Sequence, residues 1–496
     1  MEHLIYYNIF TMKHIFLFSV FILFSGILFS QNEVDALRYS QSYVGGTARY
    51  TSMSGAFGAL GGDMSVLNTN PAGIGIYRSS EIAITPSFFY NKAQTDYYSS
   101  PASDYKYSLN LGNIGFVSTY KSDNPDSDWK TTSFGIVYNK TNKFDYNYLV
   151  EGTNNNSSMI DFFLNRANGN KPENLDDYME RLAFNTWLID TLVGNPLSYF
   201  TSYSGYGETQ RKVISSSGST GEYAFSLGSN YKDILYLGAA LTINRIDYEE
   251  NSTYTELAKG SILGDLESFS YSQSLATAAT GYSFKLGAIL RPIDWLRVGG
   301  AIHTPIFYSL EDKFSSKMDA KVNNGDYYIS SSKSYLSEYE LTTPVKALVS
   351  AGFTIRKMAI IGIDYEFVDY STARLRDASL DYSYNDENKA ISTNYKAASN
   401  IRAGAEYMMD NFRVRCGMAY YGSPYKSGHL NAKSYGLSYS GGFGIRSYNF
   451  FLDFAYVHFV KQEKSFLYTV PEPMTIESVK VKTNSSQLLI TLGYKF

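Results

Sequence analysis

The chain has 496 residues and a net charge of -4; 16% of the residues are aromatic and only 18% are charged. Typical soluble domains contain about 25% charged residues. Binding to nucleic acid needs concentrated Lys and Arg, so the composition argues against a nucleic-acid partner. The single cysteine, Cys416, excludes an internal disulfide and a cysteine-based metal cluster, and there are only five histidines. We therefore expect no metal site and no cofactor in a Tyr-rich, Gly-rich chain that folds mainly as strands.

Residues 1–30 have the pattern of a secretory signal peptide. Lys13 precedes an apolar stretch from Ile15 to Leu28, and Ser30 is a small residue before a polar start. We expect cleavage after Ser30, so that the mature protein leaves the cytoplasm. The alternative is a single membrane anchor, for which the apolar stretch is short. The true start is open between Met1 and Met12.

Segments of alternating polarity recur from Glu81 onward. Ile361, Ile363 and Tyr365, for example, alternate with small or acidic residues, and this period of two places apolar and polar side chains on opposite faces of a strand. A single strand of this kind fits a soluble sandwich as well as a membrane barrel. The expected strands number fourteen, near residues 81–95, 106–121, 129–152, 220–232, 234–258, 269–291, 295–320, 335–356, 357–377, 393–409, 411–421, 432–447, 448–468 and 478–496.

The loop lengths distinguish these alternatives. Short connections, such as 122–128 and Arg356-Lys357, alternate with longer ones, and the longest runs from about 153 to 219. This alternation around an even number of strands is typical of outer-membrane barrels. We therefore predict an all-β fold, a 14-stranded antiparallel transmembrane β-barrel over residues 81–496, with a long external loop near 153–219.

The last strand has a distinctive apolar face. Leu488, Ile490, Leu492 and Tyr494 lie on one face, which ends at the terminal Phe496. Bacterial barrel-assembly machinery generally recognises a last strand of this kind, so this machinery is an expected partner. The C-terminus and the short turns are then periplasmic, and the long loops are external.

Residues 31–80 do not follow the alternating pattern and are rich in Gly and Ala. A barrel of eight strands fills itself with side chains, whereas 16–18 strands leave a channel. Fourteen strands therefore enclose a lumen wide enough to need a plug, and we predict that residues 31–80 form an N-terminal hatch inside the lumen. The alternative is a loose periplasmic tail.

Three motifs carry a family resemblance. Gly46-Thr47-Ala48-Arg49-Tyr50, the stretch from Met53 to Asp63 (MSGAFGALGGD) and Asn70-Pro71-Ala72-Gly73 resemble the N-terminal hatch of the FadL/TodX family of outer-membrane channels. Asp294-Trp295-Leu296-Arg297, His303-Thr304-Pro305 and the stretch from Tyr365 to Ser371 are weaker matches in the barrel, and the resemblance spans the mature chain. It implies transport of long-chain fatty acids or other hydrophobic compounds across the outer membrane.

The same resemblance implies a hatch, an external hydrophobic groove and a lateral opening beside a kinked third strand. Within the hatch we expect Asn70, Pro71, Ala72 and Gly73 to be the gating residues. Asn70 and Pro71 are the expected pivot, because Pro fixes φ and removes a donor and Asn can hydrogen-bond to the neighbouring backbone. For the groove, the apolar stretch from Met159 to Leu164 in the long external loop is a candidate helical wall.

The third strand changes character at Asn139, Lys140, Thr141 and Asn142, where its alternation stops. Charged side chains on the lipid face cost about 2–4 kcal/mol at the bilayer midplane and almost nothing at the interface. Either the segment lies at the outer interface, or the strand bends. A bend frees backbone groups, which lipid excludes unless they line a cavity. The second alternative is our hypothesis of a lateral opening beside residues 135–143.

The alternation places a set of polar residues in the lumen, where polar groups need partners. We expect ion pairs within this set and with the hatch; binding of a ligand carboxylate by one arginine is an alternative. Cys416 is expected to face lipid. No Gly-x-Ser-x-Gly, His-Glu-x-x-His or Walker motif occurs, so we predict no catalytic residue and no enzyme. The lumen set is Arg297, His303, Asp364, Glu366, Arg402, Glu406, Arg413 and Arg415.

The predicted function is passive uptake of hydrophobic small molecules such as long-chain fatty acids. The route would run from external capture, past the hatch, to lateral exit. The expected partners are a hydrophobic ligand, outer-membrane lipid and the barrel-assembly machinery, and we expect a monomer. The alternative is a non-transporting surface barrel that docks secreted proteins or lipopolysaccharide.

Overall fold

The computed structural model describes residues 32–203, 205–258, 265–356, 358–379, 382–471 and 474–496. The expected signal peptide, residues 1–30, lies outside these ranges. Within them, no helix has both the length and the apolar character needed to cross a membrane.

The described chain forms a closed antiparallel barrel of fourteen strands. Each strand pairs with the next along the chain, and the first pairs with the last, so the wall closes on itself. Closure leaves no sheet edge to be solvated, as a membrane-spanning sheet requires. The strands of the wall are β1 (Glu81–Tyr97), β2 (Ser100–Lys121), β3 with β4 (Trp129–Lys143, Tyr146–Asn154), β7 (Glu208–Tyr231), β8 (Leu235–Leu257), β9 (Leu266–Ile293), β10 with β11 (Leu296–His303, Phe307–Val322), β13 with β14 (Tyr335–Thr342, Lys346–Ile355), β15 with β16 (Ala359–Asp369, Arg374–Asp377), β17 (Ala397–Met409), β18 (Phe412–Tyr421), β19 (Gly436–Ser447), β20 (Phe450–Ser465) and β21 (Val479–Lys495).

The fourteen-strand prediction is confirmed, and one boundary differs substantially. The sequence predicted that the strand after the long loop begins near residue 220, but β7 begins at Glu208. Residues 208–219 are rich in Ser and look like a loop. They form strand because β4 pairs with one of their edges and β8 with the other. The external loop between β4 and β7 is correspondingly shorter.

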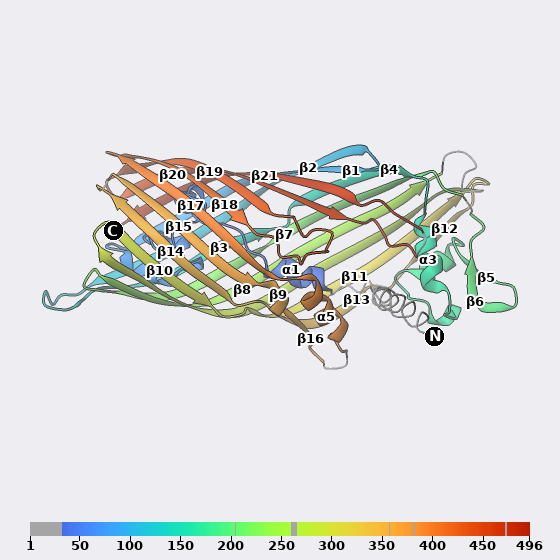
Figure 1. Cartoon of the computed structure of the whole chain (residues 1–496), viewed down its shortest axis with the longest axis horizontal. Helices are drawn as coiled ribbons and strands as arrows, with labels where there is room; N and C mark the ends of the chain where they lie inside the picture. Colours follow the sequence, from blue (N-terminus) through green and yellow to red (C-terminus); the bar gives the residue numbers. More distant parts are fainter. Residues whose placement is uncertain (1–31, 204, 259–264, 357, 380–381, 472–473) are drawn as a thin grey trace, which may run out of the picture.

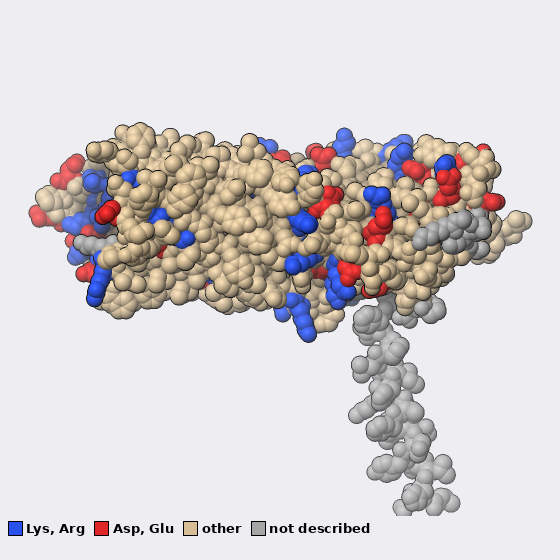
Figure 2. All heavy atoms as spheres, turned by 90° about the horizontal axis from the view of Figure 1, so that it is seen from above, with Lys and Arg blue, Asp and Glu red and all other residues tan. Residues whose placement is uncertain are grey.

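The two ends of the barrel differ (Figure 1). The short turns and the C-terminus lie at one end, the connection that holds α3, β5 and β6 lies at the other, and the connection that holds α5 lies between the two ends. Between them the wall presents exposed apolar side chains, such as Ile84, Ile136, Leu241 and Ile363, and Figure 2 shows few charged side chains on this part of the visible face. An apolar outer belt is the surface that lipid tails cover. Exposed aromatic residues accompany the short-turn end of the belt: Trp129, Trp295, Phe412, Phe450 and Phe496.

Two groups of helices accompany the barrel. The segment before β1, which we call the hatch (residues 32–80), lies inside the barrel (Figure 1). The connection from β4 to β7, which we call the cap (residues 155–207 apart from 204), lies at the end with the long loops. The hatch holds α1 (Glu33–Ser40), α2 (Ala48–Ser52), η1 (Met64–Asn68) and η2 (Pro71–Ile76). The cap holds α3 (Met159–Ala167), η3 (Pro172–Asn174), α4 (Glu180–Asn185), β5 (Asp190–Leu192) and β6 (Asn195–Phe200), and other outer loops hold β12 (Tyr327–Ser331), η4 (Tyr370–Thr372) and α5 (Asn385–Asn394).

Candidate transport path

The hatch rests against glycines of the wall. Gly352, Gly362, Gly404 and Gly417 are direct neighbours on four successive strands. A Cβ atom on Gly362 would lie 2.0 Å from the carbonyl oxygen of Ala56 in the hatch, and one on Gly404 would lie 2.4 Å from that of Met53. Only glycine lets two backbones approach this closely. We call these four glycines the hatch seat.

The predicted gating residues lie in the same contact zone on the other side of the hatch. Asn70 caps η2 by accepting from the backbone N–H of Ala72 at 3.1 Å, and its amide donates to the carbonyl of Ala288 in β9 at 3.2 Å. Pro71 occupies the first position of η2, where its missing N–H costs nothing. A Cβ on Gly287 would fall 1.9 Å from Oδ1 of Asn70. Asn70 therefore joins the hatch to the wall.

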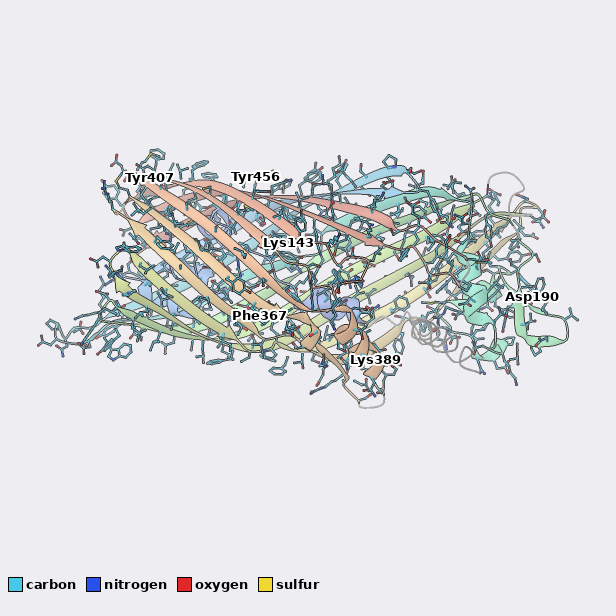
Figure 3. The ribbon with its side chains drawn as sticks, in the orientation of Figure 1. Lys143, Asp190, Phe367, Lys389, Tyr407 and Tyr456 are labelled. Carbon is cyan, nitrogen blue, oxygen red and sulfur yellow. The ribbon has the colours of Figure 1, made fainter. Side chains whose placement is uncertain are left out.

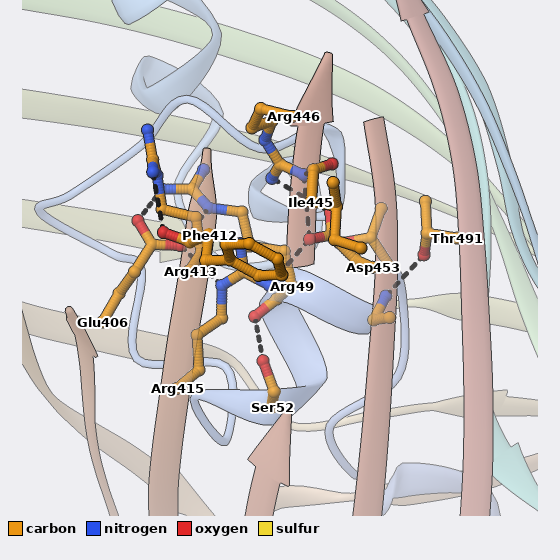
Figure 4. Close-up of polar contacts among 12 residues, drawn as sticks. Arg49, Ser52, Glu406, Phe412, Arg413, Arg415, Ile445, Arg446, Asp453 and Thr491 are labelled. Atoms are coloured by element: carbon orange, nitrogen blue, oxygen red, sulfur yellow. Dashed lines mark hydrogen bonds and ion pairs between the residues drawn. The ribbon is translucent and has the colours of Figure 1, made fainter. Parts of the chain in front are cut away.

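An ion cluster also ties the hatch to the wall (Figure 4). Arg49 of the hatch donates to both carboxylate oxygens of Glu406, at 3.0 and 3.1 Å. Arg415 bridges Glu406 at 2.5 Å and Asp453 at 2.7 Å, and Arg446 contacts Asp453 at 2.9 Å. The side chains of Arg415 and Asp453 are fully buried. Charges this deep are tolerated because each finds an opposite charge.

Other members of the predicted lumen set also meet the hatch. Arg297 donates to the carbonyl of Leu60 at 2.7 Å, His303 lies 2.8 Å from the carbonyl of Thr69, and Asp364 accepts from the N–H of Gly58 at 3.0 Å. Glu366 and Arg402 pair with each other at 2.5 Å.

Arg413 does not join this set. Its guanidinium donates to the carbonyls of Asp410 and Phe412 in the adjacent short turn. Arg413 lies beside the cluster at the end of β18 (Figure 4), but among the described residues it forms no ion pair with Glu406 or Asp453.

Sequence reasoning missed several lumen residues. Asp453 completes the ion cluster, and Lys285 pairs with Glu222 at 2.5 Å in a polar cavity of about 70 Å³ that also includes Lys346. Each is a charged residue within an alternating strand, so the rule that selected Asp364 also applies to them. Arg49 carries no such signal, because it lies in a segment without periodicity.

The wall is interrupted beside the third strand. Backbone pairing of β2 with β3 ends at Asn113 and Asn139, although β2 continues back to Ser100. The pairing of β3 with β7 shifts register between Lys140 and Asn142, and the chain continues as β4. Of the two alternatives for this polar segment, the structure has the bend. Residues 100–112 of β2 thus pair with β1 on one edge but lack a ladder partner on the edge that faces β3 and β4.

The four predicted residues of the bend bond to different neighbours. Asn139 accepts from Asn113 at 2.6 Å and donates to Asn68 of the hatch at 3.0 Å. The carbonyl of Thr141 accepts from the N–H of Tyr43 at 2.9 Å, and Asn142 donates to the carbonyl of Gln41 at 3.4 Å. The hatch therefore satisfies one backbone group of the bend, the carbonyl of Thr141, and it also bonds to the side chains of Asn139 and Asn142.

Side chains bridge the interruption. Lys140 donates to Asn110 at 2.6 Å, Asn110 donates to Ser108 at 2.7 Å, and Ser108 donates to Asp145 at 2.7 Å. We call this chain of four residues the polar bridge. It joins β2 to the bend where backbone hydrogen bonds are missing. The polar bridge supplies three side-chain hydrogen bonds where a continuous ladder would supply a regular series of backbone bonds along residues 100–112 of β2, so this part of the wall is held less firmly than a ladder.

The bend forms one side of a cavity of about 320 Å³. The hatch and the inner faces of β1, β20 and β21 supply most of the other walls. Aromatic and aliphatic side chains dominate the lining, namely Val34, Leu37, Tyr43, Val44, Phe89, Phe144, Tyr146, Tyr148, Tyr421, Tyr425, Val457 and Phe459. Polar and charged side chains line the rest of this cavity. A concave cavity that combines an apolar surface with polar groups is the usual form of a small-molecule site.

The lining of this cavity has an excess of positive charge. Four basic residues and two acidic ones contribute to it. Lys461 pairs with Glu463 at 2.8 Å, and Arg38 pairs with Asp35, which lies outside the lining. Burial raises the pKa of Asp35, and the neighbouring Arg38 lowers it. Lys140 and Lys143 remain opposite a single acidic side chain, Asp145.

The predicted helical wall of an external groove has a different role. Helix α3 forms at Met159–Ala167, but Met159, Ile160, Phe162 and Phe163 are all at most 5% exposed. They pack with Phe269 of the wall strand β9 and with Leu467 of the loop after β20 in one buried cluster. The apolar face of α3 is therefore the core of the cap, and not the side of an open groove.

Comparison with known proteins identifies the family. A family model described as "Outer membrane protein transport protein (OMPP1/FadL/TodX)" matches residues 201–496. The chain belongs to this family. Members are outer-membrane transport channels and not enzymes, which confirms the predicted localisation and the absence of an enzymatic role.

Solved structures agree on the fold. A FadL homologue of Pseudomonas aeruginosa is 14% identical, with a TM-score of 0.52 over 92% of this chain and 99% of that one. The toluene transporter TodX of Pseudomonas putida is 10% identical, with a TM-score of 0.51 over 92% of this chain and 99% of that one. No curated protein matches the sequence. At such identities the likeness concerns the fold alone.

Proposed function

We propose that this channel takes up hydrophobic small molecules, such as long-chain fatty acids, by passive diffusion and releases them sideways through the wall. The observation that carries the proposal is that the aromatic cavity and the interruption between β2 and β3 share the bend at residues 140–145. An apolar ligand in this cavity is separated from lipid by the polar bridge and not by a continuous ladder.

The sealed opposite end supports a lateral route. Below the cavity the hatch occupies the lumen, with its backbone on the hatch seat and Arg49 in the buried ion cluster. A straight path to the periplasm would have to break these contacts together. The path beside the bend requires separate side-chain hydrogen bonds to open, those of the polar bridge and two further bonds, from Lys106 to the carbonyl of Ser216 and from Asn147 to the carbonyl of Tyr105.

Cross-linking across the interruption tests the route. With Cys416→Ala as background, Ser108→Cys and Asp145→Cys place two thiols where the side chains now form a hydrogen bond. Oxidation is expected to abolish uptake of a radiolabelled long-chain fatty acid into cells, and reduction is expected to restore it.

A matched cross-link provides the control. Thr119→Cys with Ser133→Cys joins the same two strands within the intact ladder, where the hydroxyls lie 2.9 Å apart. This pair is expected to leave uptake unchanged. Full uptake with the 108–145 cross-link in place would rule out the lateral route.

A further inference from the structure

We infer that the outer face of the wall carries a binding site for lipopolysaccharide, the phosphate-bearing glycolipid of the outer leaflet. The site is formed by four exposed lysines at the ends of β20 and β21 farther from the short turns and in the loop before β19. We call them the basic patch: Lys433, Lys464, Lys480 and Lys482. The aromatic cavity lies inside the barrel, so this inference goes beyond the proposed function.

The basic patch begins where the apolar belt ends. On β20 the outward face runs from Phe450 through Tyr456 to Val460, and Tyr456 lies between the two ends of the barrel (Figure 3). A tilted strand crosses the hydrocarbon layer in about 9–11 residues, and Val460 is ten residues beyond Phe450. Lys464 is the second outward position after Val460, so it lies at the level of the lipid head groups.

The lysines of the patch lie close to one another. Lys464 and Lys480 are direct ladder partners on β20 and β21, and Lys482 follows on the same face. Like charges directly opposite each other in a sheet are destabilising. One acid is near, since Asp96 of β1 contacts Lys480 at 3.3 Å. Within the ranges that the structure describes, no carboxylate lies at ion-pair distance from the other three lysines. A bound anion would therefore relieve the repulsion.

The patch lines an open hollow of about 760 Å³ on the outside of the barrel. The loop before β19 forms one side of it. Asn431 of this loop exchanges hydrogen bonds of 2.7 and 2.9 Å with the backbone of Lys464, and this contact holds Lys433 at the hollow. Glu463 also borders the hollow, but it pairs with Lys461 at 2.8 Å. The hollow thus keeps an excess of positive charge.

The head group of lipopolysaccharide fits this chemistry. Its phosphates accept strong charge-assisted hydrogen bonds from ammonium groups. Its sugar hydroxyls can bond to Gln94 and Gln462, which flank Lys482 on the two neighbouring strands. Its acyl chains would cover the apolar belt next to the patch. Because the patch faces outward from the wall, a lipid of the surrounding leaflet reaches it by lateral diffusion.

The test compares two lipids that differ only in phosphate. Binding of bisphosphorylated lipid A and of its dephosphorylated form to the purified channel in detergent is measured by native mass spectrometry. The proteins are wild type, a variant with Lys464→Gln, Lys480→Gln and Lys482→Gln, and the same triple substitution to Arg. We expect wild type to bind the phosphorylated lipid about tenfold or more tightly. The Gln variant should lose this preference, and the Arg variant should retain it.

A matched variant controls for the loss of surface charge. Lys317 and Lys321 are exposed on the outer part of β11, but they contact Asp319 at 3.8 Å and Glu267 at 2.7 Å. Lys317→Gln with Lys321→Gln should therefore leave the preference unchanged. All variants should show the heat-modifiable band of wild type, since the substituted side chains are exposed.

Three results would overturn the site. They are equal binding of both lipids by wild type, an unchanged preference in the Gln variant, and an equal loss in the control variant. Displacement of lipid A by an equal concentration of inorganic phosphate would show a site for the free ion and would overturn the assignment to a lipid. None of these results concerns uptake through the cavity, so the proposed function is tested separately.

Discussion

The two halves of this barrel hold the same hatch in opposite ways. Toward the short turns, hatch and wall meet through backbone contacts on glycine and through buried ion pairs. Toward the long loops, the hatch borders a cavity, and its backbone bonds to a strand that has left the ladder. In the first half the hatch is fixed, because any movement of it would break many backbone contacts and ion pairs at the same time. The second half rests on separable side-chain contacts, so movement is expected there.

The largest expected effect comes from the closure of the barrel in the first half. The backbone groups of Phe496 exchange two hydrogen bonds of 3.0 Å with those of Ser80, and we propose that this terminal strand is what the assembly machinery recognises. Deletion of Phe496 should leave the protein unfolded in the periplasm. A gel assay of heat-modifiable mobility on outer-membrane fractions measures this, and a normal folded band would contradict it.

Removal of the hatch is expected to open the barrel without preventing its assembly. A variant that lacks residues 32–77 should sensitise cells to bulky polar antibiotics, because the wall pairs without help from the hatch along most of its length. The measurement is the minimum inhibitory concentration, with surface labelling to verify insertion. Unchanged sensitivity in an inserted variant would show that the hatch is not the barrier.

The ion cluster should contribute more to stability than any contact around the cavity. Glu406→Gln leaves Arg49 and Arg415 without their shared carboxylate, and breaking a buried ion pair costs about 3–5 kcal/mol. We expect a clear fall in the thermal unfolding midpoint in detergent. Glu249→Gln, which changes an exposed glutamate of β8, is the control, and an equal effect of both variants would refute the comparison.

The hatch seat should show a smaller effect of the same kind. Gly362→Val forces a side chain against the hatch backbone, and such overpacking costs about 1–3 kcal/mol. Gly300→Ala is the matched control, because its Cβ would meet nothing closer than 3.7 Å. If both variants unfold at the same temperature as wild type, the contact between hatch and wall is looser than the structure shows.

The smallest effect is expected at the polar bridge. Asn110→Ala removes a link of the bridge but no ladder bond. The free energy of unfolding should therefore fall by about 1 kcal/mol, and the unfolding midpoint should fall by less than in Glu406→Gln. Uptake of a fatty acid should not decrease, since the exit becomes easier to open. Loss of uptake in a folded variant would show that the bridge supports the path and does not block it.

Much of the fold follows from local sequence patterns. Alternation at period two identifies each strand and its apolar face, because a strand between lipid and lumen must divide its side chains in this way. It also places Asp364, Glu366, Arg402 and Glu406 inside, where the structure finds them buried. The change at Asn139 marks the bend, because polar residues on a lipid-facing strand demand a different environment.

Only the tertiary structure decided which segments far apart in the chain contact one another. No local pattern links Arg49 to Glu406, Ala56 to Gly362, or Tyr43 to Thr141, because the hatch has no periodicity and its register against the wall is set by close packing. The same holds for α3: its apolar face was visible in the sequence, but whether it formed an open groove or a buried core depended on the strands that cover it.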